Sequence, residues 1–249
     1  MRSLMTIAAL CFGTPLISQN MMELHLVLAF DVSASVNDVE FDLQRSGTAD
    51  ALRDPAVMSA IGEAPGGMAI SIVQWSSIKR QALGLDWVVL DTVEDAASYA
   101  DKVDAMPRRL PGGGTMIHAG LEFAAQQLDT APGQARRRVI DLSGNGRTDD
   151  DENLAEMRDK LISVGVVINA LAIEELNNDL TTYFYSYVIG GPQAFVATAD
   201  DFEDFTDAMQ IKLLREISGA MFSNADDKTR ETQVAHSRHF SSQPRKTRN

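Results

Sequence analysis

Apolar runs of strand length alternate along the chain with longer stretches in which apolar residues recur every three or four positions. Residues 24–30 form the first apolar run and end at Asp31. Residues 36–52 follow with apolar residues at helical spacing, and Pro55 then predicts a break or a fresh helical turn. Strands that alternate with helices predict βαβ units, a mainly parallel sheet and helices on both of its faces.

The same alternation continues to residue 221 without an internal repeat or linker. Strands are expected at residues 24–30, 68–75, 81–90, 138–143, 166–173 and 194–199. Helices are expected at residues 36–52, 92–106, 116–128, 151–164, 180–189 and 202–221. Residues 81–90 predict a strand hairpinned onto its predecessor at an edge, and the β-branched run 166–173 predicts a central parallel strand. The fold class expected is α/β: a three-layer, doubly wound, mostly parallel six-stranded sheet with one antiparallel edge strand.

The two ends of the chain differ from this body. Residues 1–20 have a positive start at Arg2 and then an apolar run too short to span a bilayer, which predicts a signal peptide and a periplasmic or secreted protein without stable membrane insertion. Cys11 is the single cysteine and lies in this segment, so cleavage would leave no thiol or disulfide. Residues 23–222 are predicted to form one domain, and residues 223–249 a disordered polar tail that is basic at its end.

Composition narrows the classes of partner. The chain has 249 residues, of which 45% are hydrophobic, so it can bury a large core without a disulfide or a structural metal. Its formal net charge of -13 argues against a nucleic-acid backbone as the main partner. An acidic surface is better suited to cations.

Candidate chemistry lies in the loops that follow the predicted strands. In doubly wound sheets, ligands bind at the carboxyl ends of the strands. The first such loop is Asp31-Val32-Ser33-Ala34-Ser35, whose alternate residues can turn one carboxylate and two hydroxyls toward a single point. Three oxygen groups make half of the shell of an octahedral cation such as Mg²⁺.

Two further loops add oxygen donors to the same edge. Gly112-Gly113-Gly114-Thr115 allows the backbone to pass close to an ion and brings the Thr115 hydroxyl to a helix start, and Ser143-Gly144-Asn145-Gly146 follows the next strand. Other uses of these residues stay open. Ser35 with Asp38, or Thr115 alone, could serve only as helix N-caps.

These motifs together resemble the metal-ion-dependent adhesion site (MIDAS) of von Willebrand factor A domains. The residues concerned are Phe30-Asp31-Val32-Ser33-Ala34-Ser35, Gly113-Gly114-Thr115 and Asn145-Gly146. The segments Arg137-Arg138-Val139-Ile140-Asp141-Leu142-Ser143-Gly144-Asn145-Gly146 and Val188-Ile189-Gly190-Gly191-Pro192 further resemble an uncharacterised bacterial branch of exported proteins with this fold. The resemblance covers residues 23–221.

The resemblance implies a Rossmann-like fold and a metal-dependent protein-binding module of the adhesion type, not an enzyme. It implies that Ser33, Ser35 and Thr115 bind Mg²⁺, or Mn²⁺ or Ca²⁺, directly, that Asp31 acts through water, and that a carboxylate of a partner protein completes the shell. Asn145 departs from the pattern, because the family usually has an aspartate there. An asparagine offers a carbonyl oxygen but no charge, so metal affinity should fall.

Several residues could compensate for the charge that Asn145 lacks. Asp141 lies within a predicted strand, where it could support the site or pair with an arginine. The residues Asp149, Asp150 and Asp151 are more typical of the acidic start of a helix. His118 could line the site, and the aromatic cluster at residues 183–187 could face a partner or pack against the sheet.

The alternative function is a metal-assisted hydrolase that uses the same cation. Two-metal hydrolases gather several carboxylates or histidines, whereas this site is rich in hydroxyls. A serine hydrolase would need a G-x-S-x-G elbow, which the sequence lacks. A binding module is therefore the favoured hypothesis.

Overall fold

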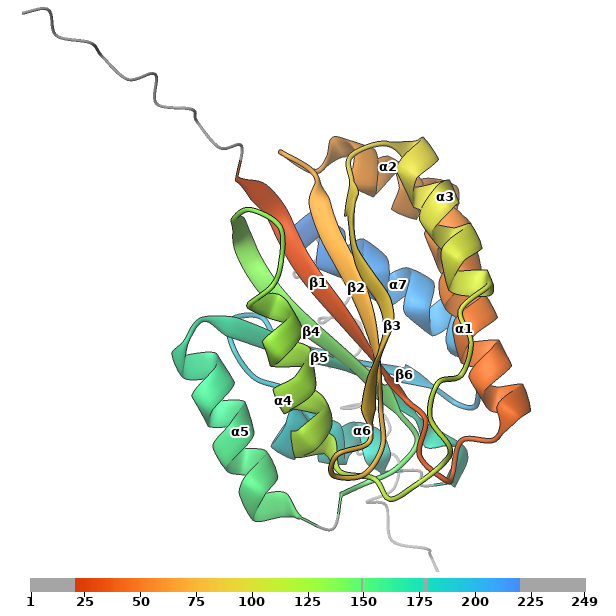
Figure 1. Ribbon diagram of the computed structural model, residues 1–249, viewed down its shortest axis with the longest axis vertical. Helices are drawn as coiled ribbons and strands as arrows, with labels where there is room; N and C mark the ends of the chain where they lie inside the picture. Colours follow the sequence, from red (N-terminus) through yellow and green to blue (C-terminus); the bar gives the residue numbers. More distant parts are fainter. Residues whose placement is uncertain (1–20, 149, 177–178, 220–249) are drawn as a thin grey trace, which may run out of the picture.

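The computed structural model of the protein describes residues 21–148, 150–176 and 179–219. The strands are β1 (Met22–Asp31), β2 (Met68–Trp75), β3 (Gln81–Leu90), β4 (Ala135–Gly144), β5 (Val166–Ile173) and β6 (Val196–Ala199). They form one six-stranded sheet in the order β3-β2-β1-β4-β5-β6, in which every neighbouring pair is parallel except β2 and β3 (Figure 1). The predicted fold class is confirmed.

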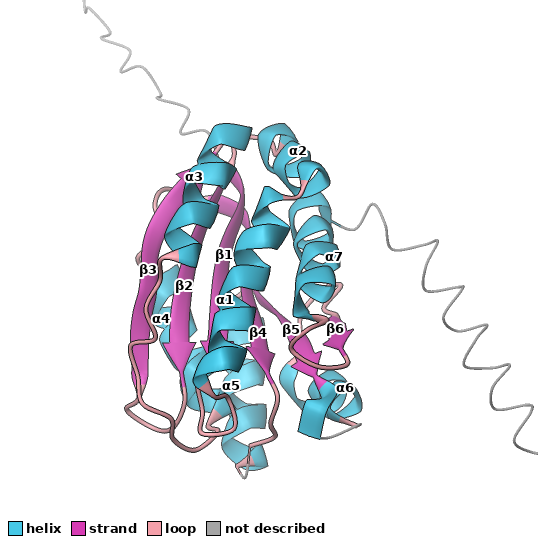
Figure 2. Ribbon diagram, turned by 90° about the vertical axis from the view of Figure 1, so that its right-hand side faces the viewer, coloured by secondary structure: helices cyan, strands magenta, loops and turns pink. Residues whose placement is uncertain are grey.

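Helices cover both faces of this sheet. They are α1 (Asp38–Arg53), α2 (Pro55–Glu63), α3 (Val93–Asp104), α4 (Ile117–Leu128), α5 (Asp151–Ser163), α6 (Leu180–Tyr183) and α7 (Phe205–Ser218). Figure 2 shows α1, α2, α3 and α7 together in front of the sheet, and α4 and α5 behind it. Alternate residues of β1 enter the two resulting cores: Leu26 and Leu28 face the first group of helices, and Val27 and Ala29 face the second.

The structure refines three details of the predicted elements. β5 lies inside the sheet but next to the edge strand β6, and the two central strands are β1 and β4. Residues 180–189 form only one turn of α-helix, and the chain continues as a π-helix over Phe184–Val188. Pro55 begins a complete helix, with Asp54 as its N-cap.

The predicted signal peptide at residues 1–20 and the predicted tail at residues 223–249 lie outside the described residues. Within the part of the chain that the structure describes, none of the helices has the length and apolar character needed to span a membrane.

Candidate metal-ion site

The topology of the sheet switches between β1 and β4. The connection from β1 to β2 passes over one face of the sheet through α1 and α2, whereas α4 leads into β4 on the other face. The strand order therefore changes direction at β1 and β4, which is where α/β sheets bind ligands. The three loops identified in the sequence meet at this edge, at the lower end of the sheet in Figure 2.

The first loop presents a buried carboxylate and two hydroxyls. Asp31 is fully buried at the end of β1, and its Oδ1 accepts a hydrogen bond of 2.7 Å from the Ser33 backbone N–H. Its Oδ2 is buried and has no hydrogen-bond partner among the described residues. The hydroxyl oxygens of Ser33 and Ser35 lie 3.0 Å apart.

The third loop is joined to the first by Asn145, which is fully buried. Its Oδ1 accepts a 2.7 Å hydrogen bond from the Ser35 hydroxyl, and its Nδ2 donates a 3.2 Å hydrogen bond to the Ser35 backbone oxygen. Asp31 Oδ2 also faces this loop, since a Cβ added to Gly144 would lie 3.0 Å from it. The Asn145 amide therefore acts as a hydrogen-bond acceptor through Oδ1 and as a donor through Nδ2.

Thr115 approaches from the second loop. A Cβ added to Gly146 would lie 3.5 Å from Thr115 Oγ1 and 4.0 Å from Ser35 Oγ, so both hydroxyls flank the same glycine. The glycines before Thr115 allow a close approach: Ala34 donates its N–H to Gly113 O at 2.8 Å, and a Cβ on Gly112 would lie 3.0 Å from Ala34 Cα. A side chain at Gly112 would push the two loops apart, and one at Gly113 would clash with the Ser76 and Ser77 hydroxyls at 2.7 Å.

The helix caps leave these hydroxyls available. The N-cap of α1 is Asn37, which forms a capping box with Glu40, and the N-cap of α4 is Met116 without a side-chain bond. Ser35 and Thr115 therefore do not act as N-caps. The structure thus brings all of the predicted site residues together: Asp31, Ser33, Ser35, Thr115 and Asn145.

The donor set is compatible with a hard divalent cation. Neighbouring oxygens in an octahedral Mg²⁺ shell lie about 3 Å apart, given metal–oxygen distances of about 2.1 Å. The hydroxyl oxygens of Ser33 and Ser35 lie 3.0 Å apart, and the Ser35 hydroxyl oxygen lies 2.7 Å from Asn145 Oδ1. The buried and unpartnered Asp31 Oδ2 is the second indication, because a buried carboxylate oxygen normally has a hydrogen-bond donor or a cation.

One arginine that the sequence analysis missed supports the site. Burial raises the pKa of Asp31 to about 6, against hydrogen bonds from Ser33, the charge of Arg108 and the backbone N–H of Asn145. The Arg108 guanidinium donates to the backbone oxygens of Val36 at 2.8 Å and Val32 at 3.2 Å, and to Asp38 Oδ1 at 3.0 Å. It therefore fixes the backbone of the first loop through contacts separate from those of Asn145.

Gln44 is a second supporting residue without a signal in the sequence. It is fully buried on α1, donates from Nε2 to the backbone oxygen of Asp31 at 3.1 Å, and accepts from Ser143 Oγ at 2.6 Å. Its amide links the ends of β1 and β4. A glutamine within an amphipathic helix is usually a surface residue, so the helical pattern alone could not identify it.

Among the described residues, the other candidates form no hydrogen bond or ion pair with the five site residues. His118 is half-buried with its Nδ1 4.0 Å from Asp150 Oδ2, in the direction of α5. Asp150 is the N-cap of α5 and Asp151 lies in its first turn, as the acidic run predicted, while Asp149 is outside the described residues. In the aromatic cluster, Tyr183 and Phe184 pack into the core, whereas two tyrosines, Tyr185 and Tyr187, are exposed.

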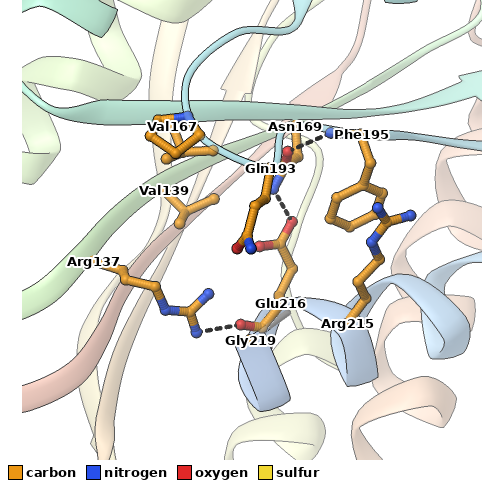
Figure 3. Close-up of a pocket in the computed structure, with 10 residues that line it drawn as sticks. Arg137, Val139, Val167, Asn169, Gln193, Phe195, Arg215, Glu216 and Gly219 are labelled. Atoms are coloured by element: carbon orange, nitrogen blue, oxygen red, sulfur yellow. Dashed lines mark hydrogen bonds between the residues drawn. The ribbon is translucent and has the colours of Figure 1, made fainter. Parts of the chain in front are cut away.

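Asp141, on β4, belongs to a buried ionic cluster with Lys212 and Glu216 of α7. It pairs with a lysine and not with an arginine: Lys212 Nζ lies 3.1 Å from Asp141 Oδ1 and 3.3 Å from Glu216 Oε1. Figure 3 shows how Glu216 also accepts from Asn169, at 2.7 Å, beside a small cavity of about 50 Å³. This cavity lies near the starts of β4 and β5, at the opposite end of the sheet from Asp31.

A wider groove adjoins the site. It has a volume of about 950 Å³ and runs along α1 past the chain that follows α3, from Ala34 and Gly112 in the two site loops to Arg45. Arg109 lines it, is exposed and forms no ion pair with any described residue. Arg45 pairs with Asp42 through Nη2, but its buried Nε finds no acceptor within the described chain.

Solved structures of low sequence identity share this architecture. Proximal thread matrix protein 1 from the mussel byssus, in a structure with a zinc-occupied MIDAS motif, is 18% identical with a TM-score of 0.56, over 78% of this chain and 46% of that chain. A von Willebrand factor type A protein from Catenulispora acidiphila is 15% identical with a TM-score of 0.55, over 78% and 43% of the respective chains. This chain thus spans less than half the length of those two proteins.

A third structure is matched over almost all of its own length. The von Willebrand factor domain of the type V pili tip protein from Porphyromonas gingivalis is 12% identical with a TM-score of 0.51, over 77% of this chain and 95% of that chain. At these identities the similarity establishes the fold alone. Among curated proteins, none matches the chain in sequence.

One family matches nearly the whole described body, over residues 21–221, and its description is "Protein of unknown function (DUF1194)". The chain belongs to this family, and its fold is that of the von Willebrand factor A domain.

Proposed function

We propose that the protein is a binding module of the adhesion type, which holds a divalent cation at Asp31, Ser33, Ser35, Thr115 and Asn145 and uses it to capture an acidic side chain of a partner protein. Mg²⁺ is the cation that this oxygen set favours, with Mn²⁺ or Ca²⁺ as substitutes. In the same proposal, residues 1–20 direct export, and the module acts in the periplasm or outside the cell.

The observation that carries this proposal is Asp31 Oδ2. It is a carboxylate oxygen in the interior, without a hydrogen-bond donor among the described residues, and it lies beside a row of hydroxyl and amide oxygens. A cation would satisfy it and would supply an open coordination position for a partner's carboxylate. The residues of this chain provide the rest: they orient the oxygens and keep Asp31 out of bulk water.

The groove beside the site offers a seat for the chain that flanks the captured residue. Its exposed Arg109, which forms no ion pair with any described residue, favours a partner segment with further acidic residues. On a chain with a net charge of -13, such a segment would otherwise be repelled.

A metal-assisted hydrolase has less support. Activation of water by paired metals requires several carboxylates or histidines, and within the described residues no group of three His, Cys, Asp or Glu side chains comes together. Asp31 is the one carboxylate among the five proposed ligands, and the remaining ligands are neutral. Such a shell favours reversible capture over water activation.

Calorimetric titration of Mg²⁺ and Mn²⁺ into the metal-free full chain tests the site, with Asp31→Ala as the matched variant. Heat of binding should appear for the wild type and vanish for the variant. Peptides selected from a random displayed library on the Mg²⁺-loaded protein and eluted with EDTA should be rich in Asp and Glu. If metal binds but no acidic peptide is enriched over the Asp31→Ala selection, the capture mechanism is wrong.

A further inference from the structure

The turn between β2 and β3 lies directly beside a proposed metal ligand. Ser76 begins this turn, and its Oγ donates a hydrogen bond of 3.1 Å to the backbone oxygen of Gly114. Its backbone oxygen accepts from the Met116 N–H at 3.0 Å, so Ser76 contacts the residues on both sides of Thr115. Figure 2 shows this turn at the lower end of the sheet, where the site loops meet. A partner held by the cation would therefore lie within reach of the turn.

The outermost residues of this turn are exposed and combine an apolar side chain with two cations. They are Ile78, Lys79 and Arg80, which we call the hairpin tip, and all three are exposed. Ile78 is 56% exposed. A single exposed apolar residue is common on protein surfaces, so Ile78 indicates nothing by itself. What distinguishes it is its place next to two cations at the rim of the proposed metal site.

The cations around the glycine loop have no acidic partners. Arg80 donates from Nη1 to the backbone oxygen of Gly112 at 2.9 Å, and Arg109 lies three residues before Gly112. Within the described residues, neither of these arginines forms an ion pair, and Lys79 forms none either. Carboxylates are plentiful on a chain with a net charge of -13, yet none neutralises these three cations. Their charge is therefore available to an acidic partner.

Lys79 has a backbone conformation that is unusual for a lysine. Its φ is 62°, and it is the third residue of a four-residue turn that the Arg80 N–H closes with a 3.0 Å hydrogen bond to Ser77 O. Glycine or asparagine normally occupies such a position, because other residues are strained at positive φ. No hydrogen bond or ion pair to a described residue holds the Lys79 side chain. A strained residue without a structural role is typical of a binding surface.

We propose that the hairpin tip is a second contact surface for the captured partner, and that it fits a protein segment in which an apolar residue lies among acidic ones. The cation binds one carboxylate of this segment. Lys79 and Arg80 face its other carboxylates, and Ile78 contacts its apolar residue. The cations select the partner more than they strengthen binding, whereas burial of Ile78 adds affinity. This inference rests on the proposed capture function and adds the class of sequence that is captured.

Two synthetic acidic peptides of equal length test this surface by fluorescence anisotropy, with the full chain in Mg²⁺. One peptide contains only glutamate, and in the other leucine replaces scattered glutamates. We expect the wild type to bind the mixed peptide more tightly than the glutamate-only peptide. Ile78→Ser should weaken binding of the mixed peptide about fivefold, because an apolar contact is lost. It should leave binding of the glutamate-only peptide unchanged.

Variants of Lys79 test the charge and the strain separately. Lys79→Gln should weaken binding of both peptides about threefold at low salt and less at high salt, because exposed charge pairs are weak and screened. Lys79→Gly should weaken binding in the same way but raise the midpoint of urea denaturation, because glycine adopts a positive φ without strain. Ile211→Ser on α7 and Lys160→Gln on α5 change exposed residues elsewhere as matched controls, and both should bind as the wild type does.

The possible failures are distinguishable. If Asp31→Ala abolishes peptide binding while Ile78→Ser and Lys79→Gln bind as the wild type does, the hairpin surface is refuted and metal-dependent capture stands. If Asp31→Ala or EDTA leaves binding unchanged while the two hairpin variants weaken it, capture through the metal is refuted and the hairpin surface stands. Equal losses for Lys79→Gln and Lys160→Gln would overturn the inference by showing that only net charge matters. A wild type that binds neither peptide would overturn it as well.

Discussion

Lys212 is a buried ammonium group whose removal should be among the most destabilising substitutions in the protein. It is fully buried, with its Nζ 3.1 Å from Asp141 and 3.3 Å from Glu216, and it also lies 4.4 Å from the centre of the Phe195 ring. Lys212→Met keeps most of the side-chain volume but leaves two carboxylates buried without their cation. Breaking a buried pair in this way costs about 3–5 kcal/mol, a large share of a typical unfolding free energy of about 5–15 kcal/mol.

Asp141→Asn should cost much less, although it removes a partner of the same pair. Burial raises the pKa of Asp141 to about 7, against the attraction of Lys212 and with repulsion from Glu216. Glu216 also accepts a hydrogen bond from Asn169. The raised pKa favours the protonated form of Asp141, and asparagine imitates that neutral form. We expect Asp141→Asn to cost about 1 kcal/mol or less at pH 8.

The two variants also differ in their pH dependence. The ordinary pKa of an aspartate, 3.8, applies to unfolded Asp141, and its folded pKa is higher. Its contribution to stability is therefore fully present below about pH 4 and is lost as the pH rises through about 7. Asp141→Asn removes this loss, so the unfolding free energy of the wild type should fall relative to that of the variant as the pH rises from 5 to 8.

Urea denaturation of the wild type and both variants at pH 5, 7 and 8 measures these differences. Lys212→Met should be least stable at pH 8, where Asp141, left without its cation, is most ionised. Equal destabilisation by Lys212→Met and Asp141→Asn at pH 8 would refute the reasoning. A stability difference between wild type and Asp141→Asn that does not change with pH would refute the assigned protonation.

Three other substitutions probe the site and its support. Arg108→Lys keeps the charge but loses the planar guanidinium that donates to two backbone oxygens of the first loop. The unfolding free energy should therefore fall by about 2 kcal/mol, and Mn²⁺ affinity should fall with it. Unchanged urea midpoints and metal titrations would contradict this. Gly120→Ala would place a Cβ 2.8 Å from the buried Trp75 ring. The resulting overpacking should cost about 1–3 kcal/mol of stability, more than the gain of about 1 kcal/mol in helix propensity. A raised melting temperature would disprove the clash. Arg109→Ala keeps the backbone N–H that bonds Gln74 and should leave stability within about 0.5 kcal/mol, while acidic peptides selected on the wild type should bind several-fold more weakly by fluorescence anisotropy.

The strands were predictable because buried parallel strands appear in sequence as continuous apolar runs. Residues 68–75 and 166–173 coincide with β2 and β5. The lateral position of β5 was not predictable, because strand order is determined by how the layers pack and not by any one strand's pattern. The π-helix at Phe184–Val188 was also missed. A π-helix has only about one more residue per turn than an α-helix, so the same aromatic residues are compatible with either.

The candidate ligands were predictable for a topological reason, and their supports were not. Loops that follow parallel strands must meet at one edge of the sheet, so position along the chain already places Asp31 near Asn145. Arg108 contacts the first loop from 72 residues away, and Gln44 contacts Ser143 from 99 residues away. No local pattern indicates such contacts.

The helix cap at the first loop shows the same limit on a smaller scale. The predicted cap pattern pairs Ser35 with Asp38, and Asn37 with Glu40 has the same spacing two residues later. Local chemistry allows either. The structure uses Asn37, whose Oδ1 accepts from two backbone N–H groups. The Glu40 carboxylate in turn accepts a hydrogen bond from the Asn37 backbone N–H. Helix α1 thereby begins late enough to leave the Ser35 hydroxyl facing Asn145.

The hydrogen bonds of Asn145 suggest why an uncharged residue occupies this position. Its Nδ2 donates to the Ser35 backbone oxygen, and an aspartate would place an acceptor against that oxygen instead. In metal-free protein, Asn145→Asp should therefore lower the unfolding free energy by about 1–3 kcal/mol, the cost of a buried polar group that loses its partner. Saturating Mn²⁺ should stabilise the variant more than it stabilises the wild type, because the added charge binds the cation only in the folded state. Thermal melts with and without Mn²⁺ measure both effects. If the metal-free variant is as stable as the wild type, the amide is not needed to join the two loops.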